Sequence, residues 1–323
     1  MILPVRPALS VVVPCFNEEG VLPEFLRRMG AALDGVGVSS EIVVVDDGSR
    51  DRTWEIVTAA TAGEPRLVGV RLMRNHGHQL ALTAGLTVCR GERILVIDAD
   101  LQDPPELLGE MMRLMDGTDG AGGADVVYGQ RRAREGETLF KRASAAAFYR
   151  LIGRMTDVEI PTDAGDFRLM TRRVLDFLLA MPERHRFVRG MVAWIGGRQV
   201  PIAYDRKPRA AGESKYPLRK MLRFAVDAIT AFSIVPLMAS MTIGWVMAAV
   251  GFTFFVYSIV GWLLGHNLPG WTSLMAAVGL LGGMQFLMLG VIGAYLGRLY
   301  DQSKGRPLFM IRDIVGGGPR DAG

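Results

Sequence analysis

Short apolar runs alternate with segments of helical periodicity between residues 8 and 130. The apolar runs, typical of strands, are Leu9–Val13, Ile42–Val45, Leu67–Leu72, Ile94–Ile97 and Val126–Tyr128. The helical patterns between them cover Glu18–Leu33, Arg52–Ala62, His78–Cys89 and Pro105–Met115. Continuously apolar strands that alternate with helices are typical of a parallel sheet covered on both faces. We therefore expect an α/β fold built on a parallel-rich sheet.

A long uncharged segment follows later in the chain. No Asp, Glu, Lys or Arg occurs from residue 228 to residue 297. Within it, Ile234–Leu264 and Ser273–Leu296 are each long enough to cross a hydrocarbon core of about 30 Å at 1.5 Å per residue, and His266–Gly270 separates them as a polar turn. A helix pair buried in a soluble core is the alternative, but such helices rarely lack a charged face. The pattern predicts a transmembrane helical hairpin.

Basic residues flank both predicted spans and are absent from the turn between them. Because Lys and Arg are enriched in cytoplasmic loops, we expect both ends of the hairpin in the cytoplasm. Apolar residues also recur at helical spacing from Leu218 to Ile229. Because this segment runs directly into a predicted span, it favours an amphipathic helix in the headgroup layer over a helix packed on the sheet. A second basic and apolar segment, Leu139–Met155, fits such a helix and a helix packed on the sheet equally well. The flanking basic residues are Arg219, Lys220 and Arg223 before the hairpin, and Arg298, Lys304, Arg306 and Arg312 after it.

The composition narrows the setting of these parts. A formal net charge of +4 without a long run of one sign suits phosphate ligands or an anionic membrane surface and gives no indication of nucleic-acid binding. Cys15 and Cys89 lack metal-site spacing and fit a reducing cytosol. The predicted division is a cytosolic α/β domain at 1–215, an interfacial helix at 216–232, the hairpin at 233–298 and a cytosolic tail at 299–323.

Polar clusters follow three of the predicted strands, at the ends where parallel α/β sheets bind ligands. They are Pro14–Glu18, Asp46–Ser49 and Asp98–Asp100. Neither a Gly-x-Gly-x-x-Gly loop nor a phosphate-binding loop ending in Gly-Lys-Ser or Gly-Lys-Thr follows the first strand, which weighs against a dinucleotide or P-loop site.

Asp98 and Asp100 are the most informative pair, because two carboxylates spaced i, i+2 at a strand end can reach one divalent cation. One or two carboxylates are how proteins present Mg²⁺ or Mn²⁺ to a diphosphate. The alternative is that both are ordinary turn formers at the end of a strand.

Seven motifs in this order resemble the polyprenyl-phosphate glycosyltransferases of glycosyltransferase family 2. The chain is similar above all to the bactoprenol glucosyltransferases within it, which are related to dolichyl-phosphate mannose synthase. The resemblance covers nearly the whole chain and implies an A-type glycosyltransferase fold, Rossmann-like and nucleotide-sugar-binding. The motifs are residues 13–18, 45–49, 98–106, 128–131, 164–170, 183–190 and 212–217.

The resemblance also implies roles for particular residues. The nucleotide sugar would contact Pro14, Phe16, Glu18, Asp46, Asp47, Asp98 and Ala99. Asp100 and Gln102 would meet Mg²⁺ or Mn²⁺. Arg131, Arg209 and Lys215 would bind the phosphates, although the last two also fit a solvated basic loop near lipid.

Asp166 is the catalytic residue that the resemblance implies, either as a base or as a group that orients the acceptor. A phosphate monoester is already largely anionic at neutral pH, so it needs little help from a base. Pairing with Arg168 alone is the other interpretation of this carboxylate. His76 and His78 form a His-x-His pair at a predicted helix start, but no carboxylate accompanies them locally and we do not expect a metal there.

The expected activity is inverting transfer of glucose from UDP-glucose to polyprenyl (undecaprenyl) phosphate at the cytoplasmic face of the inner membrane. GDP-mannose, a UDP-aminosugar or UDP-aminoarabinose are alternative donors, since the motifs do not separate uracil from guanine. A non-catalytic membrane scaffold or nucleotide-sugar sensor is the alternative from another class. Similar proteins assemble as tetramers through the membrane region, so a homotetramer is an open expectation.

Overall fold

The computed structural model describes residues 6–117, 122–131, 164–184, 186–205, 235–264 and 270–317. The chain divides into two compact units. The first unit contains a large sheet with its covering helices and includes the segment that begins at Arg306. The second contains two long apolar helices. The predicted interfacial helix at 216–232 and the segment Leu139–Met155 lie outside the described residues.

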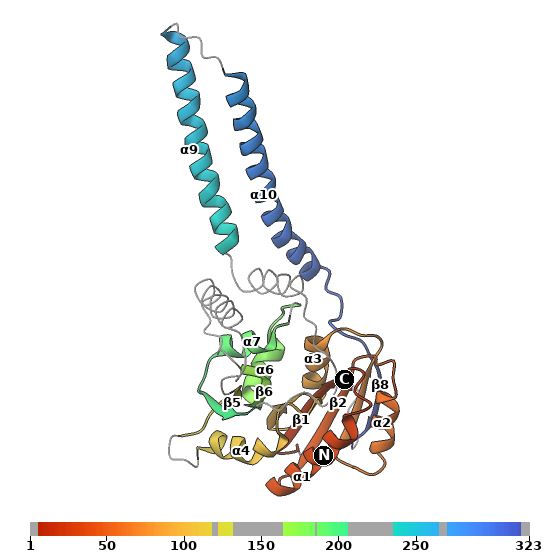
Figure 1. The fold of residues 1–323 in the computed structure, drawn as a ribbon. Helices are drawn as coiled ribbons and strands as arrows, with labels where there is room; N and C mark the ends of the chain where they lie inside the picture. Colours follow the sequence, from red (N-terminus) through yellow and green to blue (C-terminus); the bar gives the residue numbers. More distant parts are fainter. Residues whose placement is uncertain are drawn as a thin grey trace. The chain divides into compact units, whose positions relative to one another are not determined.

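The described part of the first unit is built on an eight-stranded sheet in the order β7-β5-β6-β4-β1-β2-β3-β8 (Figure 1). All five strands expected from the apolar runs are present, together with three others. The strands are β1 (Leu9–Cys15), β2 (Ser40–Asp46), β3 (Leu67–Leu72), β4 (Arg93–Val96), β5 (Val126–Arg131), β6 (Ala164–Thr171), β7 (Gln199–Tyr204) and β8 (Ile311–Gly316).

The centre of the sheet is parallel and its flanks are mixed. β4, β1, β2 and β3 run parallel to one another, which confirms the expected α/β fold with a parallel-rich sheet. β6 lies between β4 and β5 and runs antiparallel to both, with Val96 opposite Arg168. The first residues of β6 therefore lie at the edge where β4 ends. This reversal brings Asp166 to the carboxyl ends of the parallel strands.

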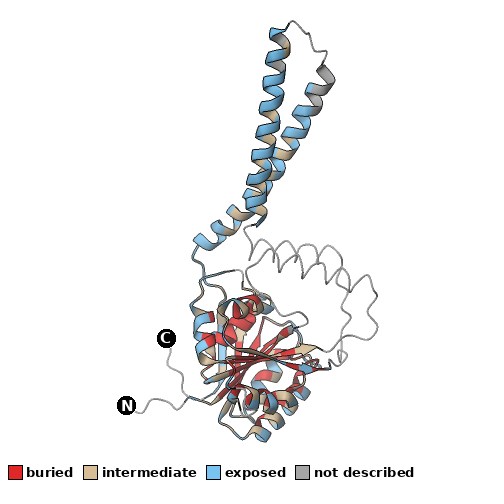
Figure 2. Ribbon diagram, turned by 90° about the vertical axis from the view of Figure 1, so that its left-hand side faces the viewer, coloured by how far each residue is buried: buried red, intermediate tan, exposed pale blue. Residues whose placement is uncertain are grey.

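Helices cover both faces of the sheet, which explains why its central strands are apolar throughout. Val11 and Val13 of β1 belong to one buried cluster, together with residues of α1, α2 and α4. Val12 belongs to another, with residues of α3, α6 and α7. Figure 2 shows the buried strands between these layers. The helices are α1 (Leu22–Val36), α2 (Thr53–Ala60), α3 (His78–Val88), α4 (Leu108–Asp116) after a 3₁₀ turn η1 (Pro105–Leu107), α6 (Arg172–Ala180) and α7 (Val188–Ile195).

The second unit presents its large apolar side chains to the outside. Its helices are α9 (Val235–Leu263) and α10 (Trp271–Ser303) (Figure 1). Phe252 and Phe286 are 67% and 76% exposed, where a soluble core helix would bury such residues. Within the described residues, Val235–Gly261 and Ala277–Ser303 are long and apolar enough to cross a membrane.

The segment after α10 returns to the first unit as a strand. Ile311–Gly316 forms β8 and pairs antiparallel with β3, with Gly69 opposite Val315. The sequence predicts a tail at 299–323, whereas the structure has a strand within it. β8 covers an edge of β3 that would otherwise present unpaired backbone groups.

Candidate active site

A pocket of about 260 Å³ lies at the carboxyl ends of the parallel strands. The loops after β1, β2 and β4 and the start of α3 form its walls. This is the edge at which α/β sheets bind ligands. Seven residues predicted to belong to the site line this pocket, namely Pro14, Phe16, Glu18, Asp47, Asp98, Ala99 and Asp100.

The loop after β1 is tied to the loop after β2 by backbone hydrogen bonds. The Asn17 N–H donates to Ser49 Oγ at 2.9 Å, and the Arg50 N–H donates to Asn17 Oδ1 at 2.9 Å. Asn17 adopts a positive φ of 57°, a conformation that Asn tolerates better than most residues. The turn leaves the neighbouring Phe16 41% exposed, so its ring is available to a planar base.

The two aspartates at the end of β2, Asp46 in the strand and Asp47 directly after it, are both buried but differ in surroundings. Asp46 is fully buried and does not line the pocket; its Oδ1 accepts a hydrogen bond from the Ser49 N–H at 3.0 Å, and its Oδ2 lies 3.5 Å from Arg71 Nε. Asp47 does line the pocket and accepts bonds from the N–H groups of His76 (2.7 Å) and Gly77 (2.8 Å). Burial raises the pKa of Asp47, while these two bonds oppose the rise. Both carboxylates therefore shape the loops around the pocket.

The acidic loop after β4 carries Asp98 and Asp100 on the pocket wall. Burial raises the pKa of Asp98 to about 6, although His78 opposes the rise. Asp98 Oδ1 is buried and accepts no hydrogen bond within the described residues, so a ligand hydroxyl could satisfy it. Asp100 Oδ1 accepts a bond from the Gln102 N–H at 3.1 Å, and Leu101 between them has a positive φ of 58°. A branched residue held in that region marks local backbone strain.

A metal ion fits this loop only if a ligand completes its coordination. Among the described residues, no three His, Cys, Asp or Glu side chains form a ready-made cage. Mg²⁺ is commonly held by one or two carboxylates together with substrate phosphates, and Asp100 on the pocket wall fits that arrangement. Gln102 is only 7% exposed and does not line the pocket; it contacts Asp100 through its backbone N–H, and its side chain stays a predicted metal ligand.

Asp166 lies near the start of β6, among hydrogen-bond donors and cations from α3, α7 and β6 itself. Its Oδ2 lies 3.1 Å from His78 Nε2 and 3.0 Å from Gln79 Nε2. Its Oδ1 faces Arg189 at 3.6 Å and Arg168 at 4.0 Å. Burial alone would raise the pKa of this carboxyl, but His78 and the two guanidinium groups hold it well below its usual range. Asp166 is therefore an anion in a largely cationic setting.

Arg131 ends β5 and reaches the same region through a buried tyrosine. Its Nε donates to the Tyr204 hydroxyl at 3.5 Å, and that hydroxyl donates to Asp103 Oδ1. Burial and the charge of Asp103 raise the pKa of Tyr204 to about 12, so the hydroxyl keeps its proton. Gly165 allows this approach, because a Cβ there would lie 2.9 Å from an Arg131 guanidinium nitrogen. Arg209 and Lys215, the other predicted phosphate ligands, lie outside the described residues.

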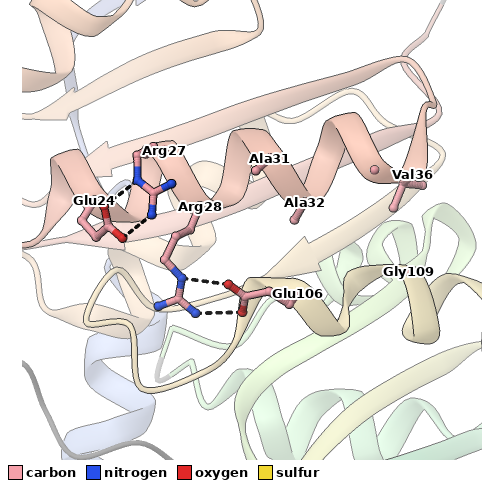
Figure 3. A pocket seen from close by; sticks show the side chains of 9 residues that line it. Glu24, Arg27, Arg28, Ala31, Ala32, Val36, Glu106 and Gly109 are labelled. Carbon is pink, nitrogen blue, oxygen red and sulfur yellow. Dashed lines mark hydrogen bonds and ion pairs between the residues drawn. The ribbon is translucent and has the colours of Figure 1, made fainter.

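A larger hollow of about 680 Å³ lies elsewhere, between α1 and the η1–α4 segment. Figure 3 shows Arg27 paired with Glu24, and Arg28 joined to Glu106 by two bonds of 2.8 Å. Its charged side chains thus neutralise one another, and it lacks the strand-end carboxylates. The smaller pocket is the chemically equipped one.

The sequence alone predicts no catalytic or binding role for His78, Gln79, Arg189 or Tyr204. His78 belongs to the His-x-His pair, which has no carboxylate near it in the sequence. The carboxylate is supplied from residue 166, which no spacing pattern could reveal. The only sequence signal for Arg189 was its place in the basic motif at 183–190.

The chain matches the model described as Glycosyl transferase family 2 over residues 10–179, a span that contains the acidic loop and Asp166. It belongs to this family and is a glycosyltransferase, as its motifs indicated. A Bacillus subtilis (strain 168) relative named "Uncharacterized glycosyltransferase YkcC" is 44% identical over 95% of this chain and 94% of its own. The "Prophage bactoprenol glucosyl transferase homolog" of Escherichia coli (strain K12) is 36% identical over 95% of this chain and 99% of its own.

Solved structures resemble the chain more distantly. S. aureus TarS (residues 1–349) in complex with UDP-GlcNAc is 19% identical, with a TM-score of 0.46, over 69% of this chain and 65% of that one. A score this low adds nothing to the family assignment.

Proposed function

We propose that this glycosyltransferase transfers a sugar, glucose from UDP-glucose, to polyprenyl phosphate at the cytoplasmic face of the membrane. The observation that carries the proposal is the acidic pocket with Asp98 and Asp100 in a chain that also has two exposed apolar helices. A relative of nearly the same length is named for transfer to bactoprenol, which supports a lipid acceptor. The helices would hold the enzyme beside that acceptor.

The nucleotide sugar occupies the pocket at the strand ends in this proposal. The exposed ring of Phe16 offers a stacking surface for uracil, and Glu18 lies beside it on the wall. Asp98 Oδ1 accepts a hydrogen bond from a hydroxyl of the ribose or the sugar. This bond satisfies a buried oxygen that has no other hydrogen-bond partner among the described residues. Asp47 on the pocket wall stays a predicted contact of the nucleotide, whereas Asp46, which does not line the pocket, fixes the loop after β2.

Mg²⁺ or Mn²⁺ would be held by Asp100, with Gln102 as the second predicted ligand. When bound, the ion stabilises the negative charge that develops on the leaving diphosphate. Arg131 adds a fixed positive charge, oriented by the Tyr204 hydroxyl. Arg209 and Lys215 remain predicted partners of the same phosphates.

The reaction is a single in-line displacement. An oxygen of the acceptor phosphate attacks the anomeric carbon, the bond from that carbon to the diphosphate breaks, and UDP leaves with the bonding electrons. Attack from the opposite face inverts the anomeric configuration and yields a β-linked product from an α-linked donor. Asp166 orients the acceptor, because an anionic phosphate oxygen needs no strong base.

Transfer of radiolabelled sugar into chloroform-soluble lipid tests this proposal. Purified protein would receive undecaprenyl phosphate, Mn²⁺ and, separately, UDP-glucose, GDP-mannose, a UDP-aminosugar or UDP-aminoarabinose, with EDTA as control. We expect EDTA-sensitive label from UDP-glucose. Label from a different donor would replace the sugar and keep the acceptor, and folded protein that labels no lipid from any donor would overturn the proposal.

A further inference from the structure

The carboxylate of Asp166 is held at both oxygens, and its four neighbours are not equivalent. Its side chain is only 10% exposed. The guanidinium groups of Arg189 and Arg168 face Oδ1 at 3.6 and 4.0 Å, which are distances of charge pairing. Among the described residues, only His78 and Gln79 have side-chain donors within hydrogen-bond distance of this carboxylate, both at Oδ2. These two residues therefore fix the rotation of the carboxylate.

Gln79 also forms a hydrogen-bonded link between two other elements of the fold. Its Nε2 donates to Asp166 Oδ2 at 3.0 Å, while its Oε1 accepts a hydrogen bond from the Val188 N–H at 2.9 Å. The residue thus links β6 to the first turn of α7. Its contribution to Asp166 is inseparable from the packing of α7.

Of the described neighbours of Asp166, His78 is the one that lines the pocket. Its ring lines the cavity and is 43% exposed, and its Nε2 lies 3.7 Å from Asp98 Oδ1 as well as 3.1 Å from Asp166 Oδ2. One imidazole nitrogen therefore lies between two carboxylates: Asp98, which would contact the nucleotide sugar, and Asp166, which would align the acceptor phosphate. Without the imidazole, the carboxylates of Asp98 and Asp166 would face each other with less compensation of their negative charge.

The backbone just before His78 is held by hydrogen bonds to Asp47, which also lines the pocket. Asp47 binds the N–H groups of His76 and Gly77, and Gly77 has a φ of 93° that favours glycine. α3 begins at the next residue. The ring is therefore presented from a rigid point rather than from a mobile loop.

We propose that His78 is a positioning residue for glycosyl transfer, whose Nε2–H sets the orientation of the Asp166 carboxylate relative to Asp98. The inference rests on the proposed function, in which Asp166 aligns the acceptor phosphate. Misplacing an aligning group by about 1 Å costs on the order of 10²-fold in rate. Loss of the ring should therefore lower kcat far more than it raises KM for the nucleotide sugar.

A double-mutant cycle tests this assignment with His78→Leu, Asp166→Asn and the double variant. We expect His78→Leu to lower kcat about 10- to 100-fold with KM for the donor within about twofold. His78→Gln, which retains a side-chain amide donor, should recover most of the loss. In the Asp166→Asn background, His78→Leu should cost less than about twofold more, because residues that act through one another are not additive.

Equal losses from His78→Leu in both backgrounds would overturn the inference, since His78 would then act without Asp166. So would an unchanged kcat, or a loss that His78→Gln does not recover while thermal unfolding stays unchanged. The cycle is run with whichever donor the wild-type protein turns over. A wrong donor therefore corrects the proposed function and leaves the cycle readable.

Discussion

Asp100 is the residue on which the proposed metal site depends. It lines the pocket at the turn after β4 and is half-buried. Asp100→Ala should lower turnover at least about 100-fold, because the charge stabilisation that a bound ion supplies is worth several kcal/mol. Thermal unfolding should stay near that of the wild type. The rate of lipid labelling, measured with and without EDTA, checks this.

The matched control is Asp176→Ala, at a carboxylate on α6 that is 64% exposed. It should leave the rate unchanged. An Asp100→Ala protein that keeps most of its activity, still sensitive to EDTA, would show that the ion is held elsewhere.

Tyr204 is predicted to fix the positions of the Arg131 and Asp103 side chains through its hydroxyl group. Tyr204→Phe keeps the edge-to-face ring contact with Phe167 at 5.8 Å but removes the hydroxyl that donates to the buried Asp103. The free energy of unfolding should fall by about 0.5–1.5 kcal/mol, the usual net contribution of one hydrogen bond. Urea denaturation measures this change. Tyr128→Phe, on a half-buried ring of β5, is the control and should change stability by less than about 0.5 kcal/mol.

Single residues also show which parts of the site could be predicted from the sequence. Pro14, Phe16, Asp98 and Asp100 were predicted together because the carboxyl ends of parallel strands meet at one edge. The contact between His78 and Asp166 was not predicted, since it joins side chains 88 positions apart. Only the antiparallel course of β6 brings them together.

At the scale of elements, regular periodicity was what made a strand or helix predictable. The strands from β1 to β4 are buried on both faces and leave unbroken apolar runs. β6 and β8 mix charged and apolar residues, as in Asp166, Arg168 and Asp313. Such short mixed segments carry too little pattern to be told from loops. The long apolar helices needed only length and the absence of charge.

β8 is expected to be locked onto β3 by a glycine. A Cβ at Gly69 would lie 2.6 Å from Val57 Cγ1 and 2.8 Å from Val315 Cγ2. Gly69→Ala should therefore loosen both α2 and β8 and lower the free energy of unfolding by about 1–3 kcal/mol, as overpacking does. Gly63→Ala, where a Cβ meets nothing within 4 Å, is the control. Equal melting temperatures for the two variants would contradict this packing.

At the scale of the whole molecule, the orientation of the hairpin in the membrane is a separate prediction. Cys15 and Cys89 are 3% and 4% exposed, so introduced cysteines can be labelled against a quiet background. A membrane-impermeant maleimide should label Asn267→Cys, between the two spans, in intact cells. Ser303→Cys, at the end of α10, should react only after permeabilisation, because basic residues favour the cytoplasmic side. The reverse pattern would contradict the proposed orientation.

The proposed reaction gives a reason for the α/β unit and the two apolar helices to occur in one chain. A nucleotide sugar is soluble and a polyprenyl phosphate is confined to the bilayer, so a pocket tethered at the membrane would raise the effective concentration of one reactant near the other. The family membership establishes glycosyl transfer, and the lipid acceptor is the central claim that remains to be measured.

Mass spectrometry of the lipid product tests that claim most directly. Purified protein would be incubated with undecaprenyl phosphate, Mn²⁺ and UDP-glucose uniformly labelled with ¹³C in the sugar. We expect undecaprenyl monophosphate carrying one labelled hexose, formed in equal amounts with UDP. UDP released without a hexosylated lipid, or a lipid diphosphate formed together with UMP, would contradict it.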